Sequence, residues 1–196
     1  MWLERISGGS VDLIEPEDAK AHLRILVDDF EAEITRAINA STAYLDVDED
    51  GFGGLGFPLI QQMWASKSSS FCADVLRLPF GRVTAINEIR FKDPAGNSSV
   101  VSSANYQLTR QGRSCFVSLL PGRAWPQLAN LPDAVEVRFS AGFSDVDVVP
   151  ADIKSAARLL ITHFFEIRQA TGDVGVPNET KIAVENLVSR YRRFAA

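Results

Sequence analysis

The most constraining feature of the sequence is an alternating apolar segment that passes through a proline into an amphipathic helical pattern. Apolar and polar residues alternate from Val135 to Phe143, which predicts a half-buried strand. Val149-Pro150 then opens a helix, because proline is tolerated in the first turn, where its missing N–H has no partner to lose. One face of this helix is apolar at Ile153, Ala156, Ala157, Leu160, Phe164 and Ile167. The segment indicates scaffold rather than a catalytic centre.

Helical patterns lie on both sides of a β-rich centre. Pro16 followed by Glu17 and Asp18 predicts a helix start, because acidic side chains favour the positive end of the helix dipole. Apolar residues at helical spacing predict a second helix over about 28–45, and a final helix begins near Asn178. No regular structure is predicted over 46–70, which contains several glycines and a serine-rich run.

The centre of the chain predicts strands and tight turns. Residues 83–92 alternate as a strand does, and 93–97 contain proline, glycine and asparagine in a turn. Residues 106–109 and 115–119 flank Gly112 as the two arms of a hairpin.

Together these elements predict an α+β fold in one domain that spans residues 1–196. In this fold the N- and C-terminal helices, over about 15–50 and 150–196, form a helical bundle. A β-rich insertion over about 75–145 lies between them. The sequence contains no internal repeat and no hinge that separates two domains.

The composition is that of an ordinary soluble globular protein, with 46% hydrophobic and 23% charged residues. No stretch approaches the roughly 20 apolar residues that span a bilayer, and the first residues lack a signal-peptide pattern, so we expect a cytoplasmic product and no membrane partner. Cys72 and Cys115 are too few for a disulfide framework. The net charge of −5 argues against broad nucleic-acid binding, which needs a basic surface.

The acidic run that begins at Asp46 resembles the start of a calcium-binding loop. Asp46, Asp48 and Asp50 alternate, and alternate carboxylates can converge on one cation. The twelfth position, which supplies a bidentate glutamate in such loops, is Phe57. We therefore favour a solvated acidic turn that ends a helix and predict no bound metal, with a calcium-tuned binding module as the alternative.

The neighbouring glycines, from Gly51 to Gly56, formally satisfy the Gly-x-Gly-x-x-Gly pattern of dinucleotide-binding loops. That pattern binds pyrophosphate only where it follows a strand and opens a helix. Here it follows an acidic run and is interrupted by Pro58, so a loop is predicted and no cofactor.

The sequence offers no recognisable catalytic constellation. Its two histidines, His22 and His163, both lie in predicted helices, where packing or partial exposure explains them better than general-base chemistry does. A nucleophile elbow, a His-Glu-x-x-His motif and a zinc-spaced cysteine pair are all missing from the sequence. We predict that the protein is not an enzyme and has no catalytic residues.

The chain ends in a basic and aromatic run that has two interpretations. Arg190, Tyr191, Arg192, Arg193 and Phe194 follow the final helical pattern. Cations at the C-terminal end of a helix complement its dipole. Arginine and tyrosine are also enriched at the energetic centres of protein interfaces, which predicts a docking tail. Both interpretations remain open at this point.

Taken in order, several of these segments resemble the head–tail connector, or adaptor, proteins of long-tailed bacteriophages and related gene-transfer particles. Such proteins often carry a Trp-Pro pair, a strand that ends in Ala-Gly-aromatic, and a Val-Pro-initiated helix that ends near Glu-x-Arg. The matching residues are Trp125-Pro126, Ala141-Gly142-Phe143, Val149-Pro150 and Glu166-Ile167-Arg168. Segments 17–25, 76–79 and 83–86 are similar to the family's opening helix and first strand region, so the likeness covers most of the chain.

The resemblance implies a structural protein of the virion, made in the bacterial host cytoplasm and placed at the head–tail joint. It implies a homo-oligomeric ring, commonly a dodecamer, that docks on the portal protein and receives a stopper or tail-completion protein. DNA would pass through the lumen without specific binding. It also favours the docking interpretation of the C-terminal run. The glycine-rich segment from Gly51 to Pro58 departs from the family pattern, in which a shorter link is expected.

Overall fold

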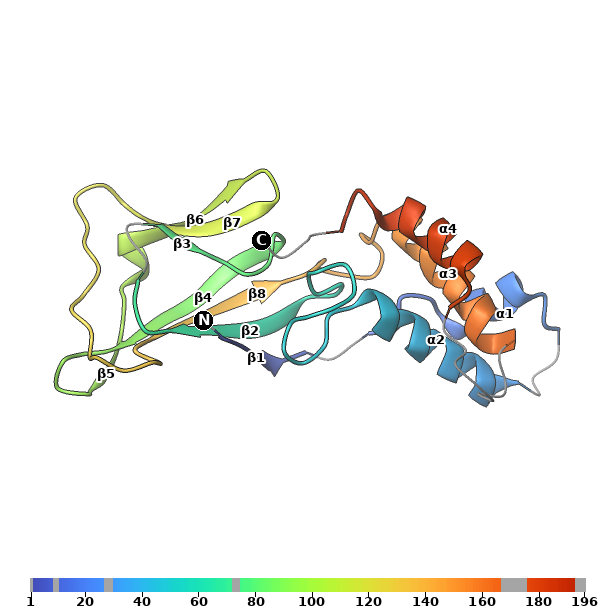
Figure 1. The fold of residues 1–196 in the computed structure, drawn as a ribbon, viewed down its shortest axis with the longest axis horizontal. Helices are drawn as coiled ribbons and strands as arrows, with labels where there is room; N and C mark the ends of the chain where they lie inside the picture. Colours follow the sequence, from blue (N-terminus) through green and yellow to red (C-terminus); the bar gives the residue numbers. More distant parts are fainter. Residues whose placement is uncertain (1, 9–10, 27–29, 72–74, 167–175, 193–196) are drawn as a thin grey trace.

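The structure is a computed structural model in which residues 2–8, 11–26, 30–71, 75–166 and 176–192 are described (Figure 1). Several residues singled out above, namely Cys72, Ile167, Arg168, Arg193 and Phe194, lie outside these ranges. The helices are α1 (Pro16–Leu23), α2 (Glu31–Leu45), α3 (Ala151–Glu166) and α4 (Asn178–Val188). The strands are β1 (Trp2–Ser7), β2 (Gln62–Ser68), β3 (Val75–Arg77), β4 (Val83–Lys92), β5 (Ser98–Val100), β6 (Tyr106–Gln111), β7 (Ser114–Leu119) and β8 (Val135–Ala141).

The strands form two antiparallel sheets, and the α+β class is confirmed. The larger sheet has the order β1-β2-β8-β4-β5, and the smaller has the order β3-β7-β6. Figure 1 shows an elongated molecule with the strands at one end and the helices gathered at the other. The predicted strand over 83–92 and the predicted hairpin around Gly112 are confirmed as β4 and as β6 with β7.

Strand β8 lies at the centre of the larger sheet and explains the alternation seen in the sequence. It pairs with β2 on one side and β4 on the other, so that Phe139 faces Trp64 and Ile86 in register. Its alternate residues Val135, Val137, Phe139 and Ala141 are buried. The rings of Trp64 and Phe80 meet edge-on at 5.1 Å, and Phe80 lies 6.0 Å from Phe139. This aromatic cluster belongs to a hydrophobic core that continues into the helices.

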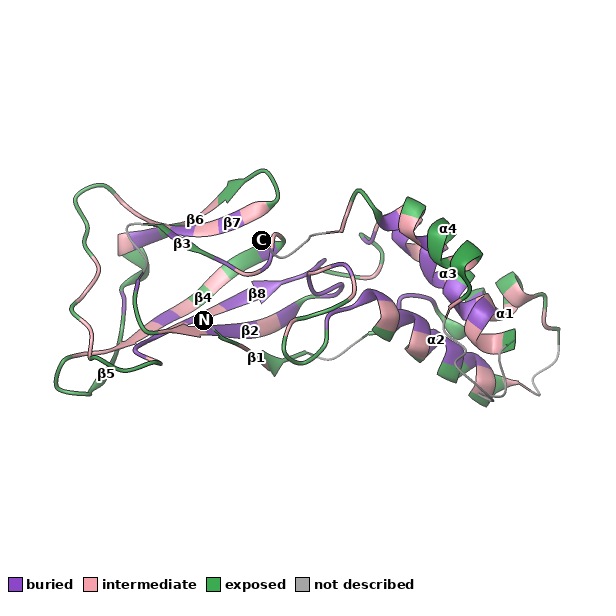
Figure 2. Ribbon diagram, viewed as in Figure 1, coloured by how far each residue is buried: buried purple, intermediate pink, exposed green. Residues whose placement is uncertain are grey.

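The helices pack on one another through the faces that periodicity predicted. Helix α3 contacts α1, α2 and α4, and α1 also contacts α2. Small residues on the facing sides, Ala37 of α2 with Ala156 and Ala157 of α3, are fully buried and allow close approach. Figure 2 shows the buried residues along the inner faces of α2 and α3 and along β2 and β8. No helix in the described part of the chain is long and apolar enough to cross a membrane.

Two strands lie where the sequence analysis placed none. The N-terminal segment is strand β1, so a bundle formed by the terminal helices does not describe the start of the chain. Strand β2 lies within 46–70, where no regular structure was predicted, and both strands fall outside the predicted β region of 75–145. The sequence of β2 lacks apolar alternation because two residues on the buried face of the strand, Gln62 and Ser66, are polar, and only Trp64 between them is apolar.

Candidate interface site at the C-terminal segment

The C-terminal basic run is held against the start of α3. The guanidinium of Arg190 forms an ion pair with Asp152, and the hydroxyl of Tyr191 donates a hydrogen bond to the same carboxylate at 3.3 Å. Asp152 lies in the first turn of α3, where the helix dipole favours a negative charge. Arg192 pairs with Glu185 of α4 at 2.6 Å. Two of the predicted interface arginines are therefore neutralised by carboxylates of the same chain.

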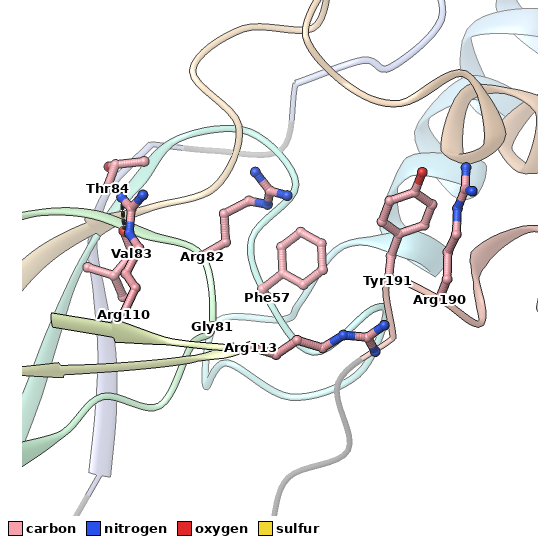
Figure 3. Close-up of a pocket in the computed structure, with 10 residues that line it drawn as sticks. Phe57, Gly81, Arg82, Val83, Thr84, Arg110, Arg113, Arg190 and Tyr191 are labelled. Carbon is pink, nitrogen blue, oxygen red and sulfur yellow. Dashed lines mark hydrogen bonds between the residues drawn. The ribbon is translucent and has the colours of Figure 1, made fainter.

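Tyr191 and Arg190 also line a pocket of about 340 Å³ between the helical part and the strands (Figure 3). The other lining residues come from the loop before β2, from the start of β4 and from the β6–β7 turn: Phe57, Gly81, Arg82, Val83, Thr84, Arg110, Gly112 and Arg113. The pocket brings three arginines of the β region together with the C-terminal segment. We refer to Arg82, Arg110 and Arg113, with the rings of Phe57 and Tyr191, as the arginine pocket.

The three arginines of the β region have no acidic partner among the described residues. Arg110 donates a hydrogen bond to the carbonyl of Val83 at 2.9 Å, and Arg113 donates one to the carbonyl of Arg192 at 3.5 Å. The guanidinium of Arg82 lies 3.8 Å from the ring centroid of Phe143. Both kinds of contact leave the positive charge uncompensated.

The local environment of Arg82 disfavours its charge. Although part of the residue is exposed, the guanidinium is partly desolvated against Phe143. This burial, together with the nearby charge of Arg110, lowers the pKa of Arg82 from its ordinary value. The side chain remains a cation at neutral pH, since arginine titrates far above that range. A cation held in this way gains from the approach of an anion.

The Ala141-Gly142-Phe143 motif positions Arg82. The Gly142 N–H donates to the carbonyl of Arg82 at 3.0 Å, and Phe143 exchanges backbone hydrogen bonds with Leu59 and Gln61 at 2.8 Å. Gly142 has a φ of 116°, and a Cβ at this residue would lie 2.5 Å from the carbonyl oxygen of Ile60. Only glycine permits this close approach. The motif therefore joins the end of β8 to two loops that line the pocket.

Asp46 proves to be a structural residue that closes the loop before β2. Its carboxylate is buried and accepts hydrogen bonds from the N–H groups of Val47 and Leu59 at 2.9 Å and from the Gln62 side chain at 3.0 Å. Burial raises the pKa of Asp46, and the three hydrogen bonds oppose part of that shift. Gly54 packs against the backbone of Asp46 in the same loop, where a Cβ would lie 2.2 Å from the Asp46 carbonyl oxygen.

The other three acidic residues of the run, Asp48, Glu49 and Asp50, are exposed. Asp48 accepts hydrogen bonds from the N–H groups of Asp50 and Phe52 at 3.0 and 2.8 Å, which orders an exposed turn. Within the described residues no three His, Cys, Asp or Glu side chains gather in a way that suits a metal ion. Because the Asp46 carboxylate already accepts backbone hydrogen bonds inside the protein, the described residues offer no set of carboxylates arranged to coordinate calcium.

The histidines lie in the helical part, away from the pocket. His22 Nε2 is 3.1 Å from the Thr162 hydroxyl, which links α1 to α3. His163 is buried on α3, where its ring lies 5.3 Å from the Phe164 ring. Cys115 is buried in β7, and its thiol donates to the Gly81 carbonyl at 3.2 Å. These contacts are packing contacts.

Sequence reasoning found the C-terminal side of the pocket but missed the arginines of the β region. Arg110 and Arg113 flank the predicted hairpin turn at Gly112, and this pairing was a usable signal that both side chains lie at the same end of the hairpin. Arg82 offered no such signal. Its place in the pocket depends on the pairing of β4 with β8, which joins residues far apart in the sequence.

Comparison with known proteins gives the class of fold. No protein-family model matches the sequence, and no curated protein does. Among solved structures, a chain from "Neck of empty GTA particle computed with C6 symmetry" aligns with a TM-score of 0.70 and 21% identity, over 100% of this chain and 97% of that chain. A chain from "Virion of native gene transfer agent (GTA) particle" gives 0.69 and 21%, and one from "Neck of native GTA particle computed with C12 symmetry" gives 0.64 and 20%, both with the same coverage.

The chain has the fold of these chains from end to end. Because the identities are near 20%, the likeness concerns the fold. The resemblance to head–tail connector proteins of phages and related gene-transfer particles is thus confirmed at the level of the fold.

Proposed function

We propose that this protein is a structural component of a virion neck, a head–tail connector that joins the DNA-filled head to the tail. The observation that carries the proposal is the fold match over the full length of this chain and 97% of chains from gene transfer agent particles. A match over 100% of this chain and 97% of those chains argues that both use the same arrangement of helices and strands. The mechanism is association between proteins and involves no covalent chemistry.

In this proposal the protein acts as a ring, with twelve copies as the expected number. Two of the similar structures are necks computed with C6 and C12 symmetry, which supports repetition around an axis. A ring of identical subunits requires two different surfaces on each copy that fit one another and whose rotation closes. The elongated shape and the separate ends of the molecule supply distinct surfaces for neighbours, portal and tail (Figure 1).

The partners follow from the same proposal. One side of the ring contacts a portal protein and the other a stopper or tail-completion protein, after synthesis in the host cytoplasm. DNA passes through the lumen unbound, and the net charge of −5 is consistent with a conduit that does not hold its cargo. The C-terminal run Arg190–Phe194 is the proposed docking segment for the portal. Its described part, Arg190 to Arg192, lies at the surface beside the start of α3.

The neck role is tested by deleting the gene from its phage or prophage and imaging the particles by electron microscopy. The expected result is filled or leaking heads beside separate, complete tails, with joining restored by the gene supplied in trans. Normal tailed particles would contradict the proposal.

The docking role of the C-terminal run has its own test, made on purified full-length protein and its portal protein. Alanine at both Arg192 and Arg193 is expected to weaken the association about tenfold, which corresponds to about 1.4 kcal/mol. Alanine at the exposed Arg36 of α2 is the matched control and is expected to leave the association unchanged. Equal effects of the two changes would refute a specific role of this segment.

A further inference from the structure

We propose that the arginine pocket of one copy receives the acidic turn Asp48–Phe52 of the next copy, so that this pair of surfaces forms the contact between neighbours in the ring. The proposal rests on the neck role, since it assigns the residues that join one copy to the next. We refer to Asp48–Phe52 as the acidic tip.

The pocket has the chemistry of a carboxylate site with an apolar wall. Arg82, Arg110 and Arg113 carry charges without an acidic partner among the described residues. Planar guanidinium groups bind carboxylates through paired hydrogen bonds, and the pairing is strengthened where water is displaced. The rings of Phe57 and Tyr191 lie beside these cations, and Figure 3 shows Arg82 and Arg113 on either side of Phe57. The ligand should therefore carry both carboxylates and an apolar group.

The acidic tip carries that combination. Asp48, Glu49 and Asp50 are consecutive and exposed, and the ring of Phe52 is 67% exposed, an unusual state for a phenylalanine. The tip is also ordered, because Asp48 accepts hydrogen bonds from the N–H groups of Asp50 and Phe52. A preformed turn loses little conformational entropy when it binds. A volume of about 340 Å³ suits a few side chains of this kind.

The two surfaces lie toward different edges of the β region, which favours a contact between separate copies. The tip lies beside β1, since Glu49 pairs with Arg5 and a Cβ at Gly51 would meet the Leu3 side chain. Strand β1 is one edge of the larger sheet, whereas the three arginines of the pocket lie at the start of β4 and around the β6–β7 turn. In Figure 1 β1 and the β6–β7 hairpin lie on opposite sides of the β region. A contact of this type is head-to-tail and forms a closed ring when its rotation closes.

DNA and free phosphate fit this pocket less well. A DNA backbone offers a run of phosphates and requires an extended basic surface, whereas these cations are confined to one hollow on a chain of net charge −5. A phosphate group leaves the aromatic wall without a partner. In a ring every copy offers one tip and one pocket, so each joint would bring carboxylates of one copy to unpaired arginines of the next.

The contact is tested by zero-length crosslinking of the full-length protein, free at high concentration and within particles. The R113K variant keeps the charge and adds an amine, which a carbodiimide joins to any carboxylate in contact with it. Equal amounts of isotopically light and heavy protein distinguish links between copies from links within one copy. The pair Lys67–Glu4, 2.5 Å apart across β2 and β1, is the internal positive control. R123K, at an exposed position outside the pocket, is the matched control.

The expected result is a light–heavy link from position 113 to Asp48, Glu49 or Asp50, absent in R123K. If the Lys67–Glu4 link forms in particles while position 113 links to none of these carboxylates, or links to another protein, the proposal is overturned. Charge reversal supplies the second measurement. R113E and D50R should each reduce the yield of tailed particles about tenfold or more, and the double variant should restore most of it.

If the R113E/D50R double variant loses the yield of tailed particles additively, the proposed contact is also overturned. These outcomes are separate from the neck role itself. If deletion of the gene abolishes tailed particles while both charge reversals assemble normally, the neck role holds and this contact does not.

Discussion

Substitution of Asp46 tests whether the loop before β2 is held by one buried carboxylate. In D46A the N–H groups of Val47 and Leu59 and the side-chain amide of Gln62 lose their acceptor inside the protein. Each unsatisfied buried donor costs about 1–3 kcal/mol, while removal of a desolvated charge returns part of that, so we expect a net loss of about 3 kcal/mol. For a protein of this size that loss lowers the Tm by about 6–12 °C.

D46N is the discriminating variant. Its side-chain oxygen still accepts from both backbone donors. Its new amide faces Gln62 Nε2, and a flip of the Gln62 amide lets it donate to Gln62 Oε1, which is buried without a hydrogen-bond partner in the wild type. We expect D46N to cost less than about 1 kcal/mol. The matched control D48A removes two hydrogen bonds from an exposed turn and should also cost about 1 kcal/mol or less. Chemical denaturation followed by circular dichroism measures all three. If D46A is no less stable than D48A, or D46N is as unstable as D46A, the reasoning is refuted.

The pH dependence of the same residue has a defined sign. Because the pKa of Asp46 is raised in the folded state, the folded protein holds this proton more tightly than the unfolded chain does. Its contribution to the free energy of unfolding therefore falls as the pH rises from the ordinary aspartate pKa through the raised pKa, and is constant above that. D46N should lack this decline. A wild-type profile that matches that of D46N across this range would show that the carboxylate is not held as described.

Three further predictions concern the pocket and its supports. G142A should lower the free energy of unfolding by at least about 2 kcal/mol, because its Cβ would meet the Ile60 carbonyl at positive φ. The control G96A, also at positive φ but in open space, should lower it by about 1 kcal/mol. Thermal unfolding compares the two variants, and equal losses would contradict the close approach at Gly142. R82M should change the free energy of unfolding by less than about 0.5 kcal/mol, since Arg82 forms no ion pair among the described residues; a loss of several kcal/mol in denaturant titration would assign Arg82 a structural role instead. D152A should release Arg190 and Tyr191 and speed amide hydrogen exchange at 190–192, while D145A, on an exposed loop, should not; unchanged exchange in D152A would show that the C-terminal segment is held by other contacts.

The parts of the fold that could be predicted from the sequence are those that depend on local periodicity. The alternation from Val135 and the helical face from Ile153 each predicted one buried surface. The apolar residues of β8 are buried, and so is the helical face from Ile153 to Leu160, while Phe164 is partly buried. Strand β2 could not be predicted from periodicity, because it is held by pairing with β1 and β8 and its buried residues Gln62 and Ser66 are polar. Strand β1 could not be predicted either, because it forms by pairing with β2, which is distant in the sequence.

The candidate site also has parts that the sequence predicted and parts that it did not. Arginine and tyrosine at the end of the chain were visible as interface types, and both line the pocket. The alternate carboxylates suggested a cation site, but Asp46 faces inward to backbone donors while Asp48 and Asp50 face solvent. That difference arises from the path of the loop through its glycines, which the spacing of the carboxylates does not encode. The convergence of Arg82 with Arg110 and Arg113 depends on tertiary structure alone.

The neck role is tested most directly by a cryo-electron microscopy reconstruction of the head–tail joint of the particle whose genome carries this gene. The account predicts a ring at the joint, of twelve copies, into which this fold fits along its full length with its sequence legible in the side-chain density. A joint whose density is fully explained by other proteins, in a particle with its tail attached, would contradict it.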